Sequence, residues 1–136
     1  MIKPNKRDIN NRQANLRWNG TGITIAGNTS FAGNGNSQLH EPRDAIVDYQ
    51  NTLYVADALN NRIQKYMRDE KYGITVAGNA NGTLGKGLNE LNEPSQVLIS
   101  SNGYMFVADR SNHRIMLWRN SSTSGELVAG LTGRYT

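Results

Sequence analysis

The sequence LYVADALNNRIQKY (Leu53–Tyr66) returns 52 residues later as MFVADRSNHRIMLW (Met105–Trp118), and this repetition decides the fold. Around it, residues 39–66 and 91–118 align without a gap and are identical at nine of 28 positions. Similarity that extends over a whole unit in register is the sequence signature of a repeat architecture. We therefore expect one structural unit that is present more than once.

Each repeat is expected to form four short β-strands. The runs rich in Ile, Val, Leu and Tyr are separated by Gly, Asn, Asp and Ser, which is the pattern of strands and turns. Some runs are apolar at consecutive positions, such as Ala45–Val47 and Met105–Val107, which indicates a sheet that is covered on both faces. Helical periodicity is missing. In the first repeat the expected strands are residues 43–48, 52–57, 62–67 and 73–78.

The fourth strand of the unit has a motif of its own, GITVAGN at Gly73–Asn79, which is preceded by GITIAGN at Gly22–Asn28 and followed by GELVAG at Gly125–Gly130. Four-stranded sheets that repeat about every 40–50 residues are typical of β-propeller blades. We predict an all-β chain of antiparallel blades that forms an incomplete propeller, with two further strands near residues 15–18 and 23–26. The expected segments are a basic, flexible lead-in with the start of a partial blade (1–19), a propeller segment (20–130) with a partial blade to about residue 28 and blades at 39–78 and 91–130, and a C-terminal end (131–136).

The succession of P-x-x-[AV]-[IL]-[VI], YVAD-x-x-N-x-R-I and G-I-T-[IV]-A-G resembles the NHL repeat over residues 20–130. This family forms propellers, commonly of about six blades, so the resemblance implies blades of the NHL type. The family usually has Gly two residues after the Pro, whereas this chain has Asp44 and Gln96. The innermost strand is therefore expected to start differently or to face solvent there. His113 matches the histidine of the family name, and Asn61 replaces it in the other copy.

The number of strands predicts that the ring is not closed. About two and a half blades are present, whereas propellers close with about four to eight, and six units would need about 310 residues. We expect a piece of a larger propeller or a truncated gene model, with the remaining blades supplied by missing sequence. Self-association of copies is the alternative. An open pair of blades leaves apolar faces and strand edges in water.

The net charge of +4 comes from the N-terminus. Residues 1–19 hold five Lys or Arg against Asp8, while residues 20–136 hold ten basic and ten acidic side chains. We therefore expect a solvated tail and no nucleic-acid partner, with an anionic partner of the basic N-terminus as the alternative.

The composition also bears on the compartment. No apolar run reaches the length of about 18 residues that a spanning helix needs, and no secretory signal or lipidation motif is present. We expect a cytoplasmic chain without membrane contact, or an extracellular one if the true N-terminus is missing. The four Asn-X-Ser/Thr sequons are a weak sign of the latter. Cysteine is absent, which excludes disulfides and thiolate metal sites.

Each repeat has one set of polar residues at and after the end of its second strand. The Asp that ends this strand is expected to accept hydrogen bonds from backbone N–H groups two or three residues on, in an Asx turn. The next Asn tolerates an unusual φ, and the Arg can reach a carboxylate or a carbonyl group. We predict a structural role for both sets, the first clamp and the second clamp. They are Asp57, Asn60 and Arg62, and Asp109, Asn112 and Arg114.

The sequence offers no recognisable catalytic constellation. His40 and His113 lie at non-equivalent positions, and neither has the neighbours of a zinc site. The glycine-rich stretch Gly33–Gln38 leads into a strand, so it lacks the helix dipole of a phosphate site. No P-loop, G-x-S-x-G or H-E-x-x-H string occurs. We expect no enzyme activity, no metal site and no cofactor.

A binding surface is instead expected where loops gather. In a four-stranded meander, the loops between blades and those between second and third strands emerge on one side, which we call the loop face. Its residues mostly differ between the two copies, so they are free to serve a partner. The candidates are Glu41, Arg43, Leu59, Asn61, Glu93, Ser95, Arg110, Ser111 and His113.

These observations favour a non-catalytic NHL-repeat scaffold whose loop face binds a protein or another ligand. The resemblance implies two alternatives. NHL propellers are similar to the substrate-recognition part of tripartite-motif and related RING ubiquitin ligases, some of which bind RNA, although a chain without cysteine holds no RING. Similar propellers also serve as amidating lyases or lactonases, whose metal ligands have no counterpart here. The fold alone does not decide among them.

Overall fold

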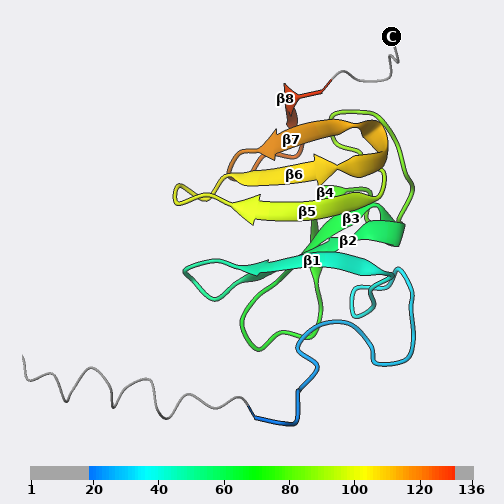
Figure 1. Cartoon of the computed structure of the whole chain (residues 1–136), viewed down its shortest axis with the longest axis vertical. Helices are drawn as coiled ribbons and strands as arrows, with labels where there is room; N and C mark the ends of the chain where they lie inside the picture. Colours follow the sequence, from blue (N-terminus) through cyan, green and yellow to red (C-terminus); the bar gives the residue numbers. More distant parts are fainter. Residues whose placement is uncertain (1–18, 131–136) are drawn as a thin grey trace, which may run out of the picture.

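The computed structural model describes residues 19–130, which form two stacked β-sheets (Figure 1). Each sheet has four antiparallel strands in chain order, β1-β2-β3-β4 and β5-β6-β7-β8. A short 3-10 turn, η1 or η2, joins the second strand of each sheet to the third. The elements are β1 (Pro42–Val47), β2 (Leu53–Asp57), η1 (Ala58–Asn60), β3 (Arg62–Tyr66), β4 (Ile74–Gly78), β5 (Pro94–Ile99), β6 (Met105–Asp109), η2 (Arg110–Asn112), β7 (Arg114–Trp118) and β8 (Glu126–Ala129).

The strands confirm the predicted all-β fold of four-stranded antiparallel blades. Those of the first sheet lie within one residue of the predicted bounds. Both sheets also have a register shift at the same place in the innermost strand, between Pro42 and Asp44 and between Pro94 and Gln96. Because even this irregularity recurs, the two sheets are copies of one blade.

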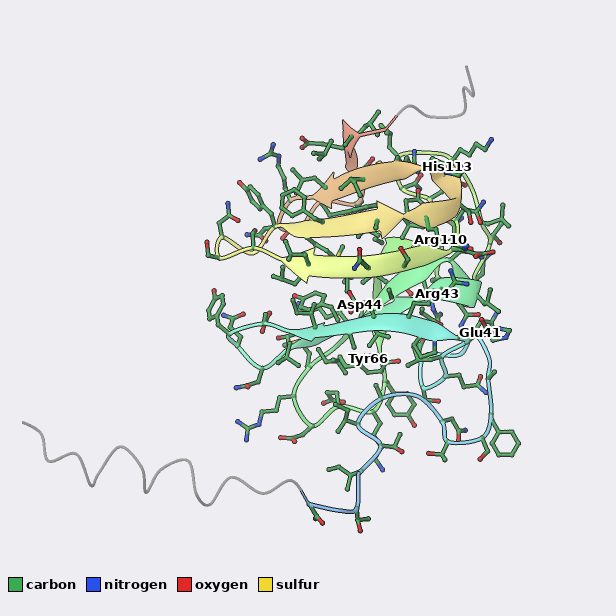
Figure 2. The ribbon with its side chains drawn as sticks, viewed as in Figure 1. Glu41, Arg43, Asp44, Tyr66, Arg110 and His113 are labelled. Atoms are coloured by element: carbon green, nitrogen blue, oxygen red, sulfur yellow. The ribbon has the colours of Figure 1, made fainter. Side chains whose placement is uncertain are left out.

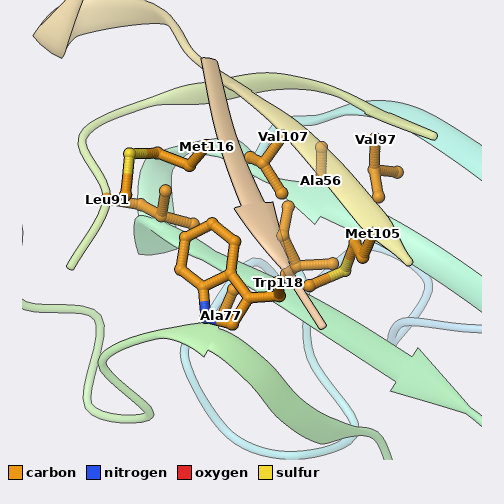
Figure 3. Packing of buried hydrophobic residues seen from close by; sticks show 9 residues of the cluster. Ala56, Ala77, Leu91, Val97, Met105, Val107, Met116 and Trp118 are labelled. Atoms are coloured by element: carbon orange, nitrogen blue, oxygen red, sulfur yellow. The ribbon is translucent and has the colours of Figure 1, made fainter. Parts of the chain in front are cut away.

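The two blades pack face to face around a common apolar core (Figure 3). The first blade contributes Ala56, Ile63 and Ala77, and the second contributes the larger Met116 and Trp118. The Trp118 indole lies beside Ala77, so a large ring fills the space above a small residue. Burial of a large apolar side chain stabilises a fold by about 1.5–3 kcal/mol. The second blade therefore supplies much of the apolar cover of the first.

The innermost strands β1 and β5 lie next to each other, and Asp44 joins them. Its Oδ2 atom accepts a hydrogen bond from the Val97 backbone N at 3.0 Å, and its Oδ1 atom accepts one from the Ala45 N at 3.0 Å. Val97 belongs to β5, an edge strand whose outer N–H groups have no strand partner. The residue that replaces the usual glycine of the NHL pattern thus satisfies a backbone donor of the next blade.

The face of the second blade that points away from the first is exposed. Leu98 and Ile115 on this face have exposed fractions of 55% and 37%. Their equivalents in the first blade, Ile46 and Ile63, pack in the interface. Within residues 19–130 no third sheet follows the second one, so this face is open, as expected for an incomplete ring of blades.

The strand predicted at residues 23–26 is not formed. Ile23 and Ile25 lie in an extended but unpaired segment and are 84% and 62% exposed. Their equivalents in β4 pair with β3, whereas no strand within residues 19–130 pairs with this segment. Without a partner for its backbone groups, a strand sequence has no ladder to join. The strand predicted near 15–18, most of the lead-in and the C-terminal end lie outside the described residues.

The glycine directly before the fourth strand of each blade makes room for an aromatic ring. A Cβ atom at Gly73 would lie 2.8 Å from the Tyr66 ring, and one at Gly125 would lie 2.9 Å from the Trp118 ring. The Gly73 N donates to the Asn36 carbonyl at 2.7 Å, which fixes the backbone over the ring. The GITVAG motif therefore begins with glycine because only glycine fits over the aromatic end of the third strand.

Tyr66→Phe is expected to raise the free energy of unfolding by about 1 kcal/mol, because it removes a buried hydroxyl without a hydrogen-bond partner. The Oη atom of Tyr66 is buried and has no partner within residues 19–130, and burial raises the pKa of its phenol. Urea unfolding followed by circular dichroism measures the change. Tyr72→Phe, at an exposed tyrosine, is the matched control and should change nothing. A loss of stability for Tyr66→Phe would contradict the assignment.

Candidate binding face

The turn between the second and third strands ends in a residue with left-handed backbone. Asn61 follows η1 with a φ of 54°, and His113 follows η2 with a φ of 54°. Asn and His are among the residues that adopt positive φ most readily. The sequence led us to expect the unusual φ one residue earlier, at Asn60 and Asn112, which instead belong to the 3-10 turns. The family's histidine position is therefore where the chain reverses.

Asp57 does not cap this turn, so the predicted Asx turn is wrong. Its Oδ1 atom accepts a hydrogen bond from the His40 backbone N at 2.7 Å. Its Oδ2 atom accepts one from Asn60 Nδ2 at 2.9 Å and one from Arg62 Nε at 2.8 Å. A bond between charged groups is about twice as strong as a neutral one. Arg62, Asn60 and the His40 backbone N–H together satisfy this carboxylate, in place of the backbone N–H groups of the turn.

Arg62 uses all five of its N–H donors. Besides Nε on Asp57, its Nη1 atom donates to the carbonyls of Asn34 and Ala80 at 2.8 and 2.9 Å. Its Nη2 atom donates to the carbonyls of Gly35 and Gln38 at 3.1 and 3.2 Å. Because a guanidinium has five donors and no acceptor, the group is fully satisfied. The first clamp thus ties the blade to the crossing before it and to the crossing after it.

The second clamp repeats this network one blade further on. Asp109 accepts hydrogen bonds from the Asn92 backbone N at 2.7 Å and from Asn112 Nδ2 at 2.8 Å. Its partner Arg114 donates to it from Nε at 2.7 Å and reaches the carbonyl of Lys86 from Nη1 at 2.8 Å. Both arginine–aspartate pairs have fully buried side chains. Neither pair is open to a ligand.

Asn61 connects the two blades on the loop face. Its Oδ1 atom accepts a hydrogen bond from the Glu93 backbone N at 2.9 Å, and its Nδ2 atom donates to the Gly82 carbonyl at 2.9 Å. The residue is buried. Of the predicted binding residues, Asn61 therefore has its side chain committed to the contact between blades.

Three charged residues of the loop face form one group that also spans both blades. Arg43 of β1 lies 3.3 Å from Glu93 Oε2, and Arg110 of η2 lies 2.7 Å from the same atom. Figure 2 shows Arg43 and Arg110 at the same end of the sheets as Glu41 and His113. The topology therefore brings these predicted residues together as expected from a four-stranded meander.

The other predicted residues of the loop face take part mainly through their backbone or flank the group. The Leu59 N donates to the His40 carbonyl at 3.1 Å, and the Ser111 N donates to the Asn92 carbonyl at 3.0 Å. Ser95 is half-buried in β5. Glu41 and Glu93 each have a φ of 48° and each precede a proline. Because this backbone conformation repeats in both blades, it belongs to the blade geometry.

Within residues 19–130, no group of three or more His, Cys, Asp or Glu side chains is arranged to hold a metal ion. Nor does this part of the chain contain a helix that is long and apolar enough to cross a membrane. Sequence reasoning missed Asp44 as a link between blades, because the departure from the glycine pattern gave no partner for it.

Comparison with known proteins gives a relative of the same repeat type. The chain is 36% identical over 86 residues to NHL repeat-containing protein 2 of Bos taurus, an overlap of 59% of this chain. The identity to the protein of the same name from Homo sapiens is 35% over 86 residues. The chain spans 12% of the length of each of these relatives. No family model matches the chain.

Proposed function

We propose that this chain, whose resemblance to NHL-repeat proteins is confirmed by these relatives and by its two blades, is a non-catalytic scaffold that binds a protein partner through its loop face. The chain spans only 12% of the length of these relatives, so this proposal concerns the two blades and not the activity of a whole protein of this kind. The scaffold role rests on three features of the loop face, which are its charge, its rigidity and the use of its carboxylates.

The observation that carries the proposal is the group of Arg43, Glu93 and Arg110. Two guanidinium groups share one carboxylate, so the group keeps a net positive charge at the boundary between blades. Arg110 is more than half exposed and contacts Glu93 from Nη1, which leaves further donors that face solvent. Arginine is enriched in protein interfaces because its planar fork makes several directed hydrogen bonds. A protein segment with carboxylates or backbone carbonyls would fit this group.

The clamps make the loop face rigid before any partner arrives. Each clamp binds backbone carbonyls of the adjoining crossing with a buried guanidinium, so the loops are fixed at several points. A surface that is already ordered loses less conformational entropy when it binds. The rigidity of the face therefore supports a role in recognition.

The carboxylates under the loop face are engaged by structural donors. Asp57 and Asp109 each accept hydrogen bonds from a buried arginine, a buried asparagine and a backbone N–H group. A general base has to reach the proton that it removes and must be free to accept it. This arrangement supports a binding role for the loop face over a catalytic one.

The triple variant Arg43→Ala, Arg110→Ala and His113→Asn, in which Asn tolerates the left-handed backbone at position 113, is expected to keep the fold and to lose the partner. Exposed ion pairs contribute only about 0–1 kcal/mol each, so unfolding in urea should change little. Partner loss should be seen as at least about tenfold weaker retention of proteins from a cell extract, measured by quantitative mass spectrometry.

A second triple variant controls for general loss of charge. Arg68→Ala, Lys71→Ala and Tyr72→Ala change exposed residues in the loop between β3 and β4, at the other end of the first blade. These changes should leave retention of the partner intact. Unfolding of the first triple variant, or equal loss of the partner by both, would contradict the proposal.

A further inference from the structure

We infer that a cleft between the two blades binds a small amphipathic organic anion, with an apolar body and one anionic group. The cleft has a volume of about 500 Å³, which is within the range of small-molecule sites. Its lining draws on the ends of strands opposite the loop face, namely the start of β2, the end of β3 and the loop between β7 and β8. This inference is independent of the proposed protein-binding role.

The floor of the cleft is apolar. Val76 of the first blade and Ile99 of the second blade are half-buried and offer apolar surface here, above the buried core residues Trp118, Met105 and Ala77. Figure 3 shows the Trp118 indole beside Ala77, with Met105 close by, in the core beneath the cleft. A ring or a short alkyl body placed here would remove apolar surface from water on both sides.

The rim of the cleft is positively charged. Lys65 holds its Nζ atom 5.8 Å from the centre of the Tyr54 ring and has no carboxylate partner within residues 19–130. Burial raises the pKa of the Tyr54 phenol, and Asp48 raises it further. The phenol therefore stays neutral and does not offset the charge of Lys65. No Asp or Glu lines this cleft.

A second cation on the rim is already paired. Arg119 lies over the Tyr104 ring at 5.1 Å and binds Glu126 at 2.7 and 3.2 Å. Its charge is therefore balanced locally, and the charge that a ligand would neutralise is that of Lys65. The loop 120–123 also lines the cleft; its Asn120 amide donates to the Asn102 carbonyl and its Ser122 hydroxyl to the Ser124 carbonyl, which leaves the hydroxyls of Ser121 and Thr123 as donors. These groups suit the several acceptor oxygens of a carboxylate, sulfonate or phosphate ester.

The apolar floor and the unpaired lysine together define the class of ligand. A neutral apolar molecule would leave the ammonium group beside it without a partner and partly desolvated. A simple inorganic anion would leave the half-buried Val76 and Ile99 in contact with water. An amphipathic anion satisfies both parts of the cleft.

Binding of 8-anilinonaphthalene-1-sulfonate to the full chain tests this inference, with Trp118 as the reporter. In a Trp18→Phe background, Trp118 is the remaining tryptophan and should transfer excitation energy to a dye that lies in the cleft. Lys65→Met keeps the length of the side chain but removes its charge, and is expected to weaken binding about tenfold. Lys71→Met, at an exposed lysine outside the cleft, should leave the affinity within about twofold.

The uncharged analogue N-phenyl-1-naphthylamine separates charge from apolar contact. It should bind about tenfold more weakly than the sulfonate, and Lys65→Met should not change its affinity. If Lys65→Met does not fold, Lys65→Gln and the salt dependence of sulfonate binding to the parent chain give the same answer. The inference is overturned if the affinity for the sulfonate changes neither with substitution of Lys65 nor with salt. It is also overturned if Leu98→Asn, on the exposed face of the second blade, abolishes binding of the sulfonate.

Discussion

Arg62→Met is expected to lower the free energy of unfolding by about 3–5 kcal/mol, because it leaves the buried Asp57 carboxylate without its countercharge. The same change removes the hydrogen bonds to the carbonyls of Asn34, Gly35 and Ala80. Methionine has a similar length and fills part of the space, so the loss reports polar contacts more than a cavity. Urea unfolding, followed by tryptophan fluorescence and circular dichroism together, measures the effect.

Arg68→Met provides the control for the loss of a positive charge. Arg68 pairs with Asp69 at 3.5 Å, and both side chains are exposed. Its substitution should change the free energy of unfolding by less than about 0.5 kcal/mol. If the two arginine variants proved equally stable, the first clamp would not hold the blade to its crossings in solution.

Gly78→Ala is expected to destabilise the fold by about 3 kcal/mol or more, because a positive φ and a steric clash act together. Gly78 has a φ of 80°, and a Cβ atom there would lie 2.2 Å from the Asn61 carbonyl oxygen and 2.9 Å from Arg62 Cα. Both atoms belong to the backbone beside the first clamp, so they can only move if β3 moves away from β4. Thermal and urea unfolding measure the loss.

Gly82→Ala separates the two causes. Gly82 has nearly the same φ, 82°, but its nearest neighbour would be the Asn60 carbonyl oxygen at 3.5 Å, an ordinary contact. Only the backbone strain remains, which costs about 1 kcal/mol. Equal losses for the two variants would mean that the close approach of β4 to the turn after η1 has no energetic weight.

The blades could be predicted from the sequence because their causes are local. Residues 53–57 and 62–66 are runs of strand-forming residues with turn-forming residues on either side. The same order recurs 52 residues later. Two copies of one pattern limit the choice of fold much more than one copy does. The segment 23–26 has the same pattern but no pairing strand within residues 19–130, so its local sequence was not sufficient.

The contacts of the clamps could not be predicted, because their partners are distant in the chain. Asp57 bonds with the backbone of His40, 17 residues before it, and Arg62 bonds with carbonyls at Asn34 and Ala80. A rule for local turns considers only the nearest amides. That the arginine would reach a carboxylate or carbonyl was expected, but which one depended on how the crossings fold over the blade.

The cleft between the blades was also beyond the sequence. Lys65 and Trp118 belong to equivalent ends of the third strands, one residue apart in the repeat, and their side chains point to opposite faces of their sheets. They come together only because the second blade stacks on the first. A loop face can be predicted from topology, whereas a cleft between sheets depends on the packing of their side chains.

The acceptors of both clamps have a consequence for how such repeats can vary. Arg62 donates hydrogen bonds to the carbonyls of Asn34, Gly35 and Gln38. Arg114 donates hydrogen bonds to the carbonyls of Lys86, Gly87 and Glu90. These are main-chain atoms, which every amino acid supplies. The hydrogen bonds of the clamps therefore place no demand on the side chains of their acceptor residues, whereas an insertion or deletion in a crossing would move its carbonyls away from the guanidinium. For these contacts the length of a crossing therefore matters more than its composition.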